Sequence, residues 1–151
     1  MMLKIGDKAP EFPGLSEAKG QWVLLYFYPK DDTPGCTTEA CSIRDSWPEF
    51  KKLKAVVLGV SVDSEKSHAK FTAKYDLPFT LIPDVDKKIV SAYGVWAKKK
   101  MMGREYMGTL RTSFLIDPEG KIAKIYEKVK PEEHVEEVLA DLTNLQKSNS
   151  K

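Results

Sequence analysis

An unbroken run of apolar and aromatic residues from Val23 to Tyr28 is the feature that most narrows the possible folds of this chain. The run stops at Pro29, and its length is that of a strand rather than of a helix. A strand without polar alternation is covered on both faces, which is typical of a parallel sheet with helices on either side. A second run of this kind spans 55–62. We therefore expect an α/β fold built around these two strands.

Amphipathic segments and turn residues separate and follow the two runs. A helical stretch is predicted over 36–54 from apolar residues three and four apart, and Pro48 should kink or split it. Segment 96–110 has no periodicity, and we expect a loop there. The other expected elements are a helix capped by Asp63 or Ser64, a strand over 79–82, a helix over 88–93, an antiparallel hairpin over 111–126 and a last helix that opens at Pro131. This order predicts an α/β domain with a mixed sheet.

Composition excludes several classes of protein. A length of 151 residues, 42% hydrophobic and 30% charged, describes one globular domain spanning 1–151, with a frayed tail over 146–151. No apolar run approaches the roughly 20 residues that cross a bilayer, and the first residues have no signal-peptide core. A net charge of +2 does not indicate nucleic-acid binding. We expect a cytoplasmic protein with neither a nucleic-acid nor a membrane partner.

Cys36 follows a segment of turn formers, 31–35, and opens the predicted helix. The start of a helix presents unpaired N–H groups and a positive partial charge, which stabilise the reactive thiolate. Pro34 and Gly35, directly before the cysteine, let the backbone approach a small ligand closely. The alternative is that Cys36 is a small buried hydrophobic residue, as unpaired cysteines usually are. Position alone leaves both interpretations open.

A second cysteine, Cys41, lies five residues after Cys36. In an α-helix, Cα atoms at this spacing are roughly 8.7 Å apart. A disulfide needs a Cα separation below about 7 Å. The two thiols can therefore bond only if the first turns of the helix unwind, which describes a switch and not a structural cross-link.

Residues 29–41, Pro-Lys-Asp-Asp-Thr-Pro-Gly-Cys-Thr-Thr-Glu-Ala-Cys, resemble the active-site segment of the Q-type peroxiredoxins, also called bacterioferritin comigratory proteins. Segments 60–63, 93–96 and 113–117 resemble the same family, in the expected order. The resemblance implies a thioredoxin-like fold with a central mixed β-sheet flanked by helices, and a thiol-dependent peroxidase that reduces hydrogen peroxide and organic hydroperoxides. Segment 13–16 departs from the family as a shortened version of its N-terminal strand and turn.

The resemblance also implies a role for each matching residue. Cys36 would attack the peroxide and become a sulfenic acid, which Cys41 would resolve as an intramolecular disulfide. Thr33 would hydrogen-bond the thiolate and the peroxide. Arg111 would stabilise the thiolate and the leaving oxygen, because a guanidinium stays charged and donates in a planar fork. The remaining candidates line the substrate pocket, with Glu39 orienting Arg111: Pro29, Pro34, Gly35 and Glu39.

The same resemblance implies a reductant, thioredoxin or a similar dithiol, and a monomer or weak dimer. No cofactor and no metal are expected. The possible ligands Cys36, Cys41, His68 and His134 match no familiar zinc spacing.

Other functions are less favoured by the residues. A non-enzymatic redox sensor or holdase could use the same cysteine pair, whereas a disulfide reductase normally carries Cys-x-x-Cys. The serines near His68 do not form the G-x-S-x-G motif of a hydrolase. Arg44 could be a second active-site arginine, although a surface ion pair is the commoner role. The basic run 98–100 could bind an acidic partner or could be a solvated loop.

Overall fold

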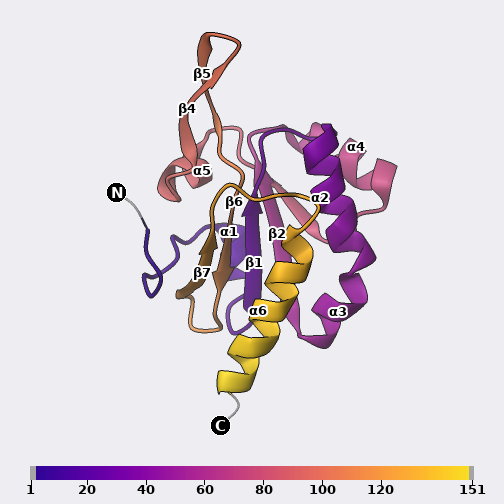
Figure 1. Cartoon of the computed structure of the whole chain (residues 1–151), viewed down its shortest axis with the longest axis vertical. Coiled ribbons are helices and arrows are strands. Elements are labelled where there is room, and N and C mark those ends of the chain that lie inside the picture. Colours follow the sequence, from indigo (N-terminus) through magenta and orange to yellow (C-terminus); the bar gives the residue numbers. More distant parts are fainter. Residues whose placement is uncertain (1–2, 150–151) are drawn as a thin grey trace.

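The computed structural model describes residues 3–149, and its centre is a five-stranded mixed sheet in the order β3-β2-β1-β6-β7 (Figure 1). The three strands β1, β2 and β3 run parallel, and β6 and β7 are antiparallel to their neighbours. The strands are β1 (Trp22–Phe27), β2 (Ala55–Ser61), β3 (Thr80–Pro83), β6 (Thr112–Ile116) and β7 (Ile122–Tyr126). The sequence prediction of an α/β fold with a central mixed sheet is confirmed.

Strand β1 is buried along its whole length because it lies in the middle of the sheet with a core on each face. Leu24 and Tyr26 pack into one core, while Val23, Leu25 and Phe27 pack into the other. Alternate side chains of a strand point to opposite faces. Two apolar cores therefore require an apolar residue at every position, which explains the unbroken run.

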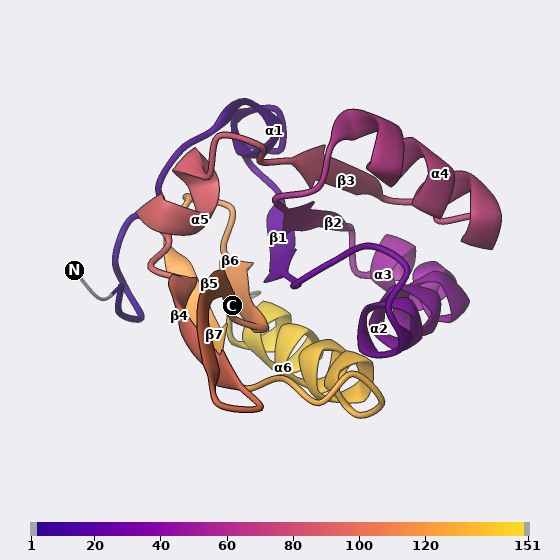
Figure 2. The same cartoon turned by 90° about the horizontal axis from the view of Figure 1, so that it is seen from above.

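Helices cover both faces of the sheet (Figure 2). Helices α2, α3, α4 and α6 lie on one side, and the short α1 and α5 lie on the other. Within residues 3–149 no helix is both long and apolar enough to cross a membrane. The helices are α1 (Pro13–Ser16), α2 (Pro34–Asp45), α3 (Trp47–Lys52), α4 (Glu65–Tyr75), α5 (Lys88–Ala92) and α6 (His134–Asn149).

The long helical stretch predicted after the turn is split, as its proline indicated. Helix α2 ends at Asp45 and α3 begins at Trp47, with Pro48 in its first turn. Proline is tolerated there because the first amides of a helix have no partner within it. The predicted cap of α4 is also confirmed, since the Ser64 hydroxyl accepts a hydrogen bond from the Ser67 amide at 3.1 Å.

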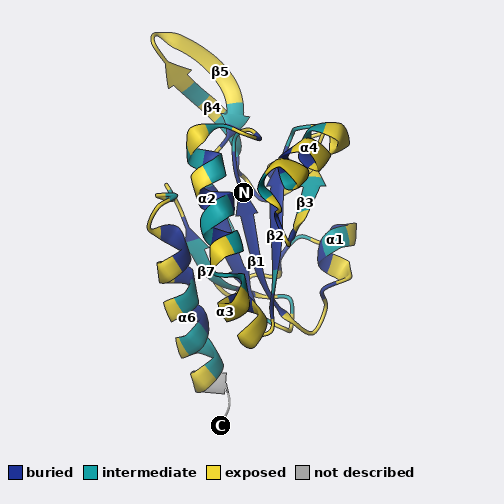
Figure 3. Ribbon diagram, turned by 90° about the vertical axis from the view of Figure 1, so that its right-hand side faces the viewer, coloured by how far each residue is buried: buried dark blue, intermediate teal, exposed yellow. Residues whose placement is uncertain are grey.

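The prediction of a loop over 96–110 is wrong. Strands β4 (Trp96–Met101) and β5 (Arg104–Thr109) pair along their whole length and project beyond the sheet (Figure 1). Met102 and Gly103 form the two-residue turn with positive φ angles of 52° and 81°, the backbone that tight hairpins prefer. Figure 3 shows this hairpin as mostly exposed. With neither face fully buried, its sequence has no hydrophobic alternation to reveal it.

Both ends of the chain differ from the prediction. Segment 13–16 is the short helix α1, where a shortened strand and turn was expected. The last helix begins at His134, three residues after Pro131, and continues through Asn149. The Gln146 side chain donates to the Leu53 carbonyl at 2.6 Å, and the frayed tail over 146–151 stays a prediction. Residues 150–151 of that predicted tail lie outside the described residues.

Candidate active site

Cys36 lies in the first turn of α2, where its side chain is only 1% exposed. Thr33 is the N-cap residue, and the first hydrogen bond of the helix runs from the Thr37 amide to the Thr33 carbonyl at 2.8 Å. The amides before Thr37 therefore have no partner within the helix and give its start a positive partial charge. The sulfur is held in the part of the helix that best stabilises an anion.

Arg111 brings a full positive charge to the same sulfur. Its Nη2 lies 3.2 Å from the Cys36 Sγ, and its Nη1 donates to the Glu39 Oε1 at 3.0 Å. Burial alone would lower the pKa of Arg111, but the negative charges of Cys36 and Glu39 outweigh it and raise that pKa. The guanidinium stays charged, and from its position just before β6 its two arms contact two residues of α2, Cys36 and Glu39.

Gly35 allows this close approach. A Cβ atom at this position would lie 3.1 Å from Arg111 Nη2 and 3.7 Å from the Pro131 ring. Any larger residue would press on the guanidinium that contacts Cys36. Gly35, which was predicted to line the pocket, therefore leaves the space that the Arg111 guanidinium occupies.

Glu39 is fully buried beneath Arg111, with no exposed surface. Desolvation raises the pKa of Glu39 from 4.5 to about 7, although the charge and hydrogen bond of Arg111 act in the opposite direction. Its second oxygen, Oε2, has no hydrogen-bond partner within residues 3–149. The carboxyl group is thus held by Arg111 on one side only, and both of its protonation states are accessible near neutral pH.

We expect Glu39→Gln to change how stability depends on pH. The pKa of Glu39 is raised in the folded protein, so its contribution to stability is complete below pH 4.5 and is lost as pH rises through about 7. Glutamine keeps an oxygen for Arg111 but cannot ionise. Urea unfolding should therefore show the variant gaining stability over the wild type, by a few kcal/mol, across this interval. The exposed Glu49→Gln is the matched control, and parallel pH curves for all three proteins would contradict this assignment.

Asp31 fastens the loop that leads to Cys36. Its carboxylate accepts hydrogen bonds from the Tyr28 hydroxyl at 2.6 Å and the Ser67 hydroxyl at 2.7 Å, and it lies 2.7 Å from the His68 Nδ1. Burial alone would raise the pKa of Asp31, but these donors lower it. Burial likewise opposes the charge on His68, yet Asp31 raises the pKa of the imidazole. A buried carboxylate–imidazolium pair thus ties the loop to α4.

The three side chains of Asp31, Asp63 and His68 have potential ligand atoms within 4.8 Å of one another. The geometry nevertheless favours the ion pair over a metal site. His68 directs Nδ1 at Asp31 and Nε2 at the Ile82 carbonyl, 3.1 Å away, so both ring nitrogens face acceptors. A doubly protonated imidazole has no lone pair for a metal.

The other predicted site residues are placed around this centre. The Thr33 hydroxyl donates to the Lys30 carbonyl at 2.9 Å, which stabilises the turn rather than the sulfur. Pro34 is exposed at the first position of α2, and Pro29 is half-buried after β1. Cys41 is partly exposed on the same helix as Cys36, and both thiols are free.

Residues that the sequence left undecided have structural roles. Arg44 forms an ion pair with Asp45 at 3.0 Å and donates to the Tyr75 carbonyl at 2.8 Å. The buried His134 places its Nε2 2.8 Å from the Ser113 hydroxyl. Burial lowers the pKa of His134 to about 4, so the imidazole is neutral near pH 7 and its 3.6 Å approach to Glu137 is no ion pair.

Sequence reasoning missed the buried pair of Asp31 and His68. Asp31 stands in a dense set of turn formers, and His68 stands between lysines on a predicted helix, so neither position suggested burial. No local pattern marks the pair, because Asp31 and His68 lie 37 residues apart in the sequence.

Comparison with known proteins gives consistent matches. The AhpC/TSA family model matches residues 5–125. Peroxiredoxin Bcp of Bacillus subtilis is 49% identical over 96% of this chain and 98% of its own length. A mutant peroxiredoxin Q of Xylella fastidiosa superposes with a TM-score of 0.90 at 38% identity, covering 97% of this chain and 99% of the other. A Xanthomonas campestris bacterioferritin comigratory protein, described for its alkyl peroxide reduction activity, superposes with a TM-score of 0.83 at 42% identity. The match covers 91% of this chain and 84% of the other.

Proposed function

Because this chain belongs to the AhpC/TSA family as a peroxiredoxin of the Bcp or Q type, and is thus a thiol peroxidase, we propose that Cys36 attacks the peroxide and that Cys41 resolves the product. The observation that carries the proposal is the contact of the Arg111 Nη2 with the Cys36 Sγ at 3.2 Å, at the start of α2. A helix terminus and a fixed guanidinium together favour a thiolate.

In the first step the Cys36 thiolate attacks the terminal oxygen of a hydroperoxide. The S–O bond forms as the O–O bond breaks, so the sulfur is oxidised to a sulfenic acid and the peroxide is reduced to an alkoxide. The alkoxide takes a proton from solvent and leaves as an alcohol, or as water when the substrate is hydrogen peroxide. Arg111 stabilises the thiolate before the step and the developing negative oxygen during it. Thr33 at the N-cap is our candidate for orienting the peroxide.

In the second step the Cys41 thiol condenses with the sulfenic acid, forming the disulfide and releasing water. Both cysteines lie within the single helix α2, where ideal geometry separates their Cα atoms by roughly 8.7 Å, beyond the reach of a disulfide. The first turns of α2 must therefore unwind. We infer that thioredoxin or a similar dithiol then reduces the disulfide and that the helix reforms.

Peroxide turnover separates this enzyme from a redox sensor. Reduced protein is mixed with hydrogen peroxide or an organic hydroperoxide in a stopped-flow instrument, and NADPH consumption is followed with thioredoxin and thioredoxin reductase present. We expect rapid oxidation of Cys36 and many turnovers with at least one of the peroxides. A single stoichiometric oxidation without turnover would favour the sensor, and turnover with another dithiol alone would reassign the reductant.

We expect Cys41→Ser to separate the two steps. The variant should consume one equivalent of peroxide at close to the wild-type rate, because Cys41 takes no part in the first step. Its sulfenic acid should then accumulate and be trapped by dimedone, as mass spectrometry can show. Coupled turnover should fall by about a hundredfold or more, since the intramolecular thiol is lost. Full thioredoxin-coupled turnover by this variant would rule out Cys41 as the resolving residue.

A further inference from the structure

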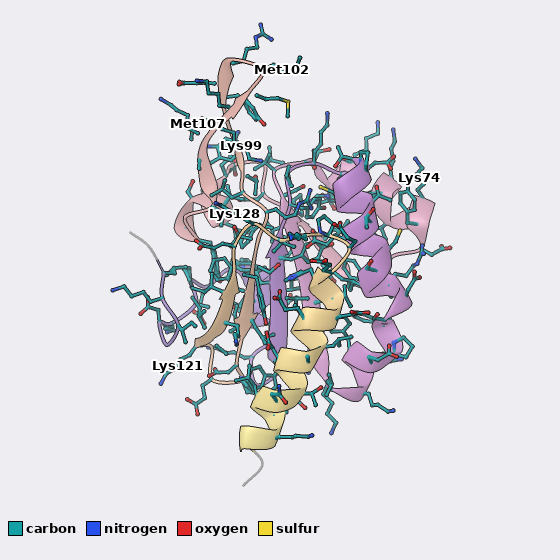
Figure 4. The ribbon with its side chains drawn as sticks, viewed as in Figure 1. Lys74, Lys99, Met102, Met107, Lys121 and Lys128 are labelled. Carbon is teal, nitrogen blue, oxygen red and sulfur yellow. The ribbon has the colours of Figure 1, made fainter. Side chains whose placement is uncertain are left out.

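The β4–β5 hairpin stands beside the proposed active site, and its base is continuous with Arg111. Strand β5 ends at Thr109, two residues before Arg111. The Leu110 amide donates to the Val95 carbonyl at 2.8 Å, which closes the base of the hairpin. The exposed tip carries Met102, 96% exposed, whereas Lys99 lies nearer the body of the protein (Figure 4).

Lys99 differs from the lysines on either side of it. Lys98 and Lys100 are exposed, whereas Lys99 is partly buried. Lys98 approaches the Glu105 carboxylate at 3.6 Å. Lys99 has no carboxylate within ion-pair distance in residues 3–149. A lysine that loses solvent without gaining a carboxylate partner is unfavourable unless some other group uses its charge.

The side chain of Lys99 runs toward the base of the hairpin. Lys99 pairs with Tyr106, and the next pair toward the base on the same face is Ala97 with Gly108. A Cβ atom at Gly108 would lie 2.9 Å from the Lys99 Cδ. The aliphatic stem therefore crosses the bare glycine backbone and carries the ammonium group toward the end of the hairpin that leads to Arg111.

Electrostatics agree with this direction. Burial first, and then the positive charge of Arg111, lower the pKa of Lys99, while the Cys36 thiolate acts the other way. The ammonium group is thus within electrostatic range of both Arg111 and Cys36. Because like charges repel, holding Lys99 near Arg111 costs free energy that a nearby anion can offset.

We propose that Lys99 is a second cation of the peroxidase site, which acts with Arg111 to stabilise the Cys36 thiolate and the negative oxygen released when the O–O bond breaks. Gly108 is the residue that lets the lysine stem reach this position. The inference rests on the proposed function, because it concerns the same attack of Cys36 on peroxide. Lys99 acts through the electrostatic effect of its positive charge on the thiolate and on the leaving oxygen. The hairpin that carries it forms one wall of the site.

The test compares three reduced variants by stopped-flow reaction with hydrogen peroxide. Lys99→Met should lower the second-order rate constant by about fivefold, the size expected for one charge acting across a partly solvated site. It should also lower the thiolate absorbance of Cys36 at neutral pH, which a purely structural role would not change. Lys99→Arg keeps the charge and should stay within about twofold of the wild type. Lys100→Met removes the same charge from the exposed side of the same strand and should also stay within about twofold.

A fourth variant, Gly108→Ala, tests the direction of the Lys99 side chain without removing its charge. The φ angle of Gly108 lies outside the left-handed region, so Gly108→Ala adds no left-handed backbone strain. Its Cβ would lie 2.9 Å from the Lys99 Cδ and 3.2 Å from the Tyr106 ring, so it displaces the flexible lysine stem and presses on the tyrosine. We expect a partial loss of rate, and no additional loss when Gly108→Ala is combined with Lys99→Met. Circular dichroism melting curves confirm that each variant is folded.

Equal rates for Lys99→Met and Lys100→Met would overturn the inference, and so would additive effects of the Gly108 and Lys99 substitutions. Failure of the wild type to react rapidly with any peroxide would instead overturn the proposed function. The two failures are therefore distinguishable.

Discussion

Replacing Cys36 with serine is expected to abolish peroxide turnover, with a loss of about a thousandfold or more. A hydroxyl group is not ionised near neutral pH, and an alkoxide at this site would need far more stabilisation than Arg111 and the start of α2 provide. The measurement is NADPH consumption in the coupled assay, together with the single-turnover reaction of the reduced protein. Both signals should fall to the rate of peroxide without protein.

The fold should tolerate this substitution. Cys36 belongs to the core that α2 packs into, and serine is slightly smaller and can accept a hydrogen bond from Arg111. A melting curve close to that of the wild type would show that lost activity is chemical and not structural. Rapid peroxide consumption by the folded Cys36→Ser protein, with Cys41 as the only thiol left, would assign the attack to Cys41 and overturn the order of the two cysteines.

The second large effect is expected for Arg111→Met, which should slow the reaction of Cys36 with peroxide by about a hundredfold or more, the range found when one preorganised donor to a developing oxyanion is removed. Arg111 contacts the Cys36 sulfur at 3.2 Å and stays charged between it and Glu39. Stopped-flow rates and thiolate absorbance should both fall. Arg111→Lys, which keeps the charge but loses the two-armed geometry, should be intermediate.

Removing Arg111 also leaves Glu39 buried without its partner, which could weaken the fold. The double variant Arg111→Met with Glu39→Gln controls for this, because glutamine carries no charge to be stranded. It should recover stability without recovering rate. If the double variant reacted with peroxide as fast as the wild type, Arg111 would have to be regarded as structural only.

Much of the fold was predictable because its signals are local. Three such signals each depend on a few consecutive residues: the apolar run over β1, the proline that separates α2 from α3 and the serine cap of α4. The β4–β5 hairpin was not predictable in this way. Its faces are mostly exposed and its turn is Met102-Gly103, so neither hydrophobic alternation nor a common turn dipeptide marks it.

The sequence alone determined that a cysteine opens a helix after a tight turn, and that a second cysteine follows too far along that helix to bond without unwinding it. Both statements depend on spacings of a few residues, which helix geometry fixes. The family resemblance implied a role for Arg111 at the thiolate, but no local pattern does, and it is the tertiary structure that brings Arg111 to the sulfur from 75 residues away. It also decided that Glu39 lies buried beneath that arginine, that Asp31 pairs with His68 and that Lys99 lies along Gly108. These relations depend on strand register and on how helices cover the sheet, and no local pattern encodes either of them.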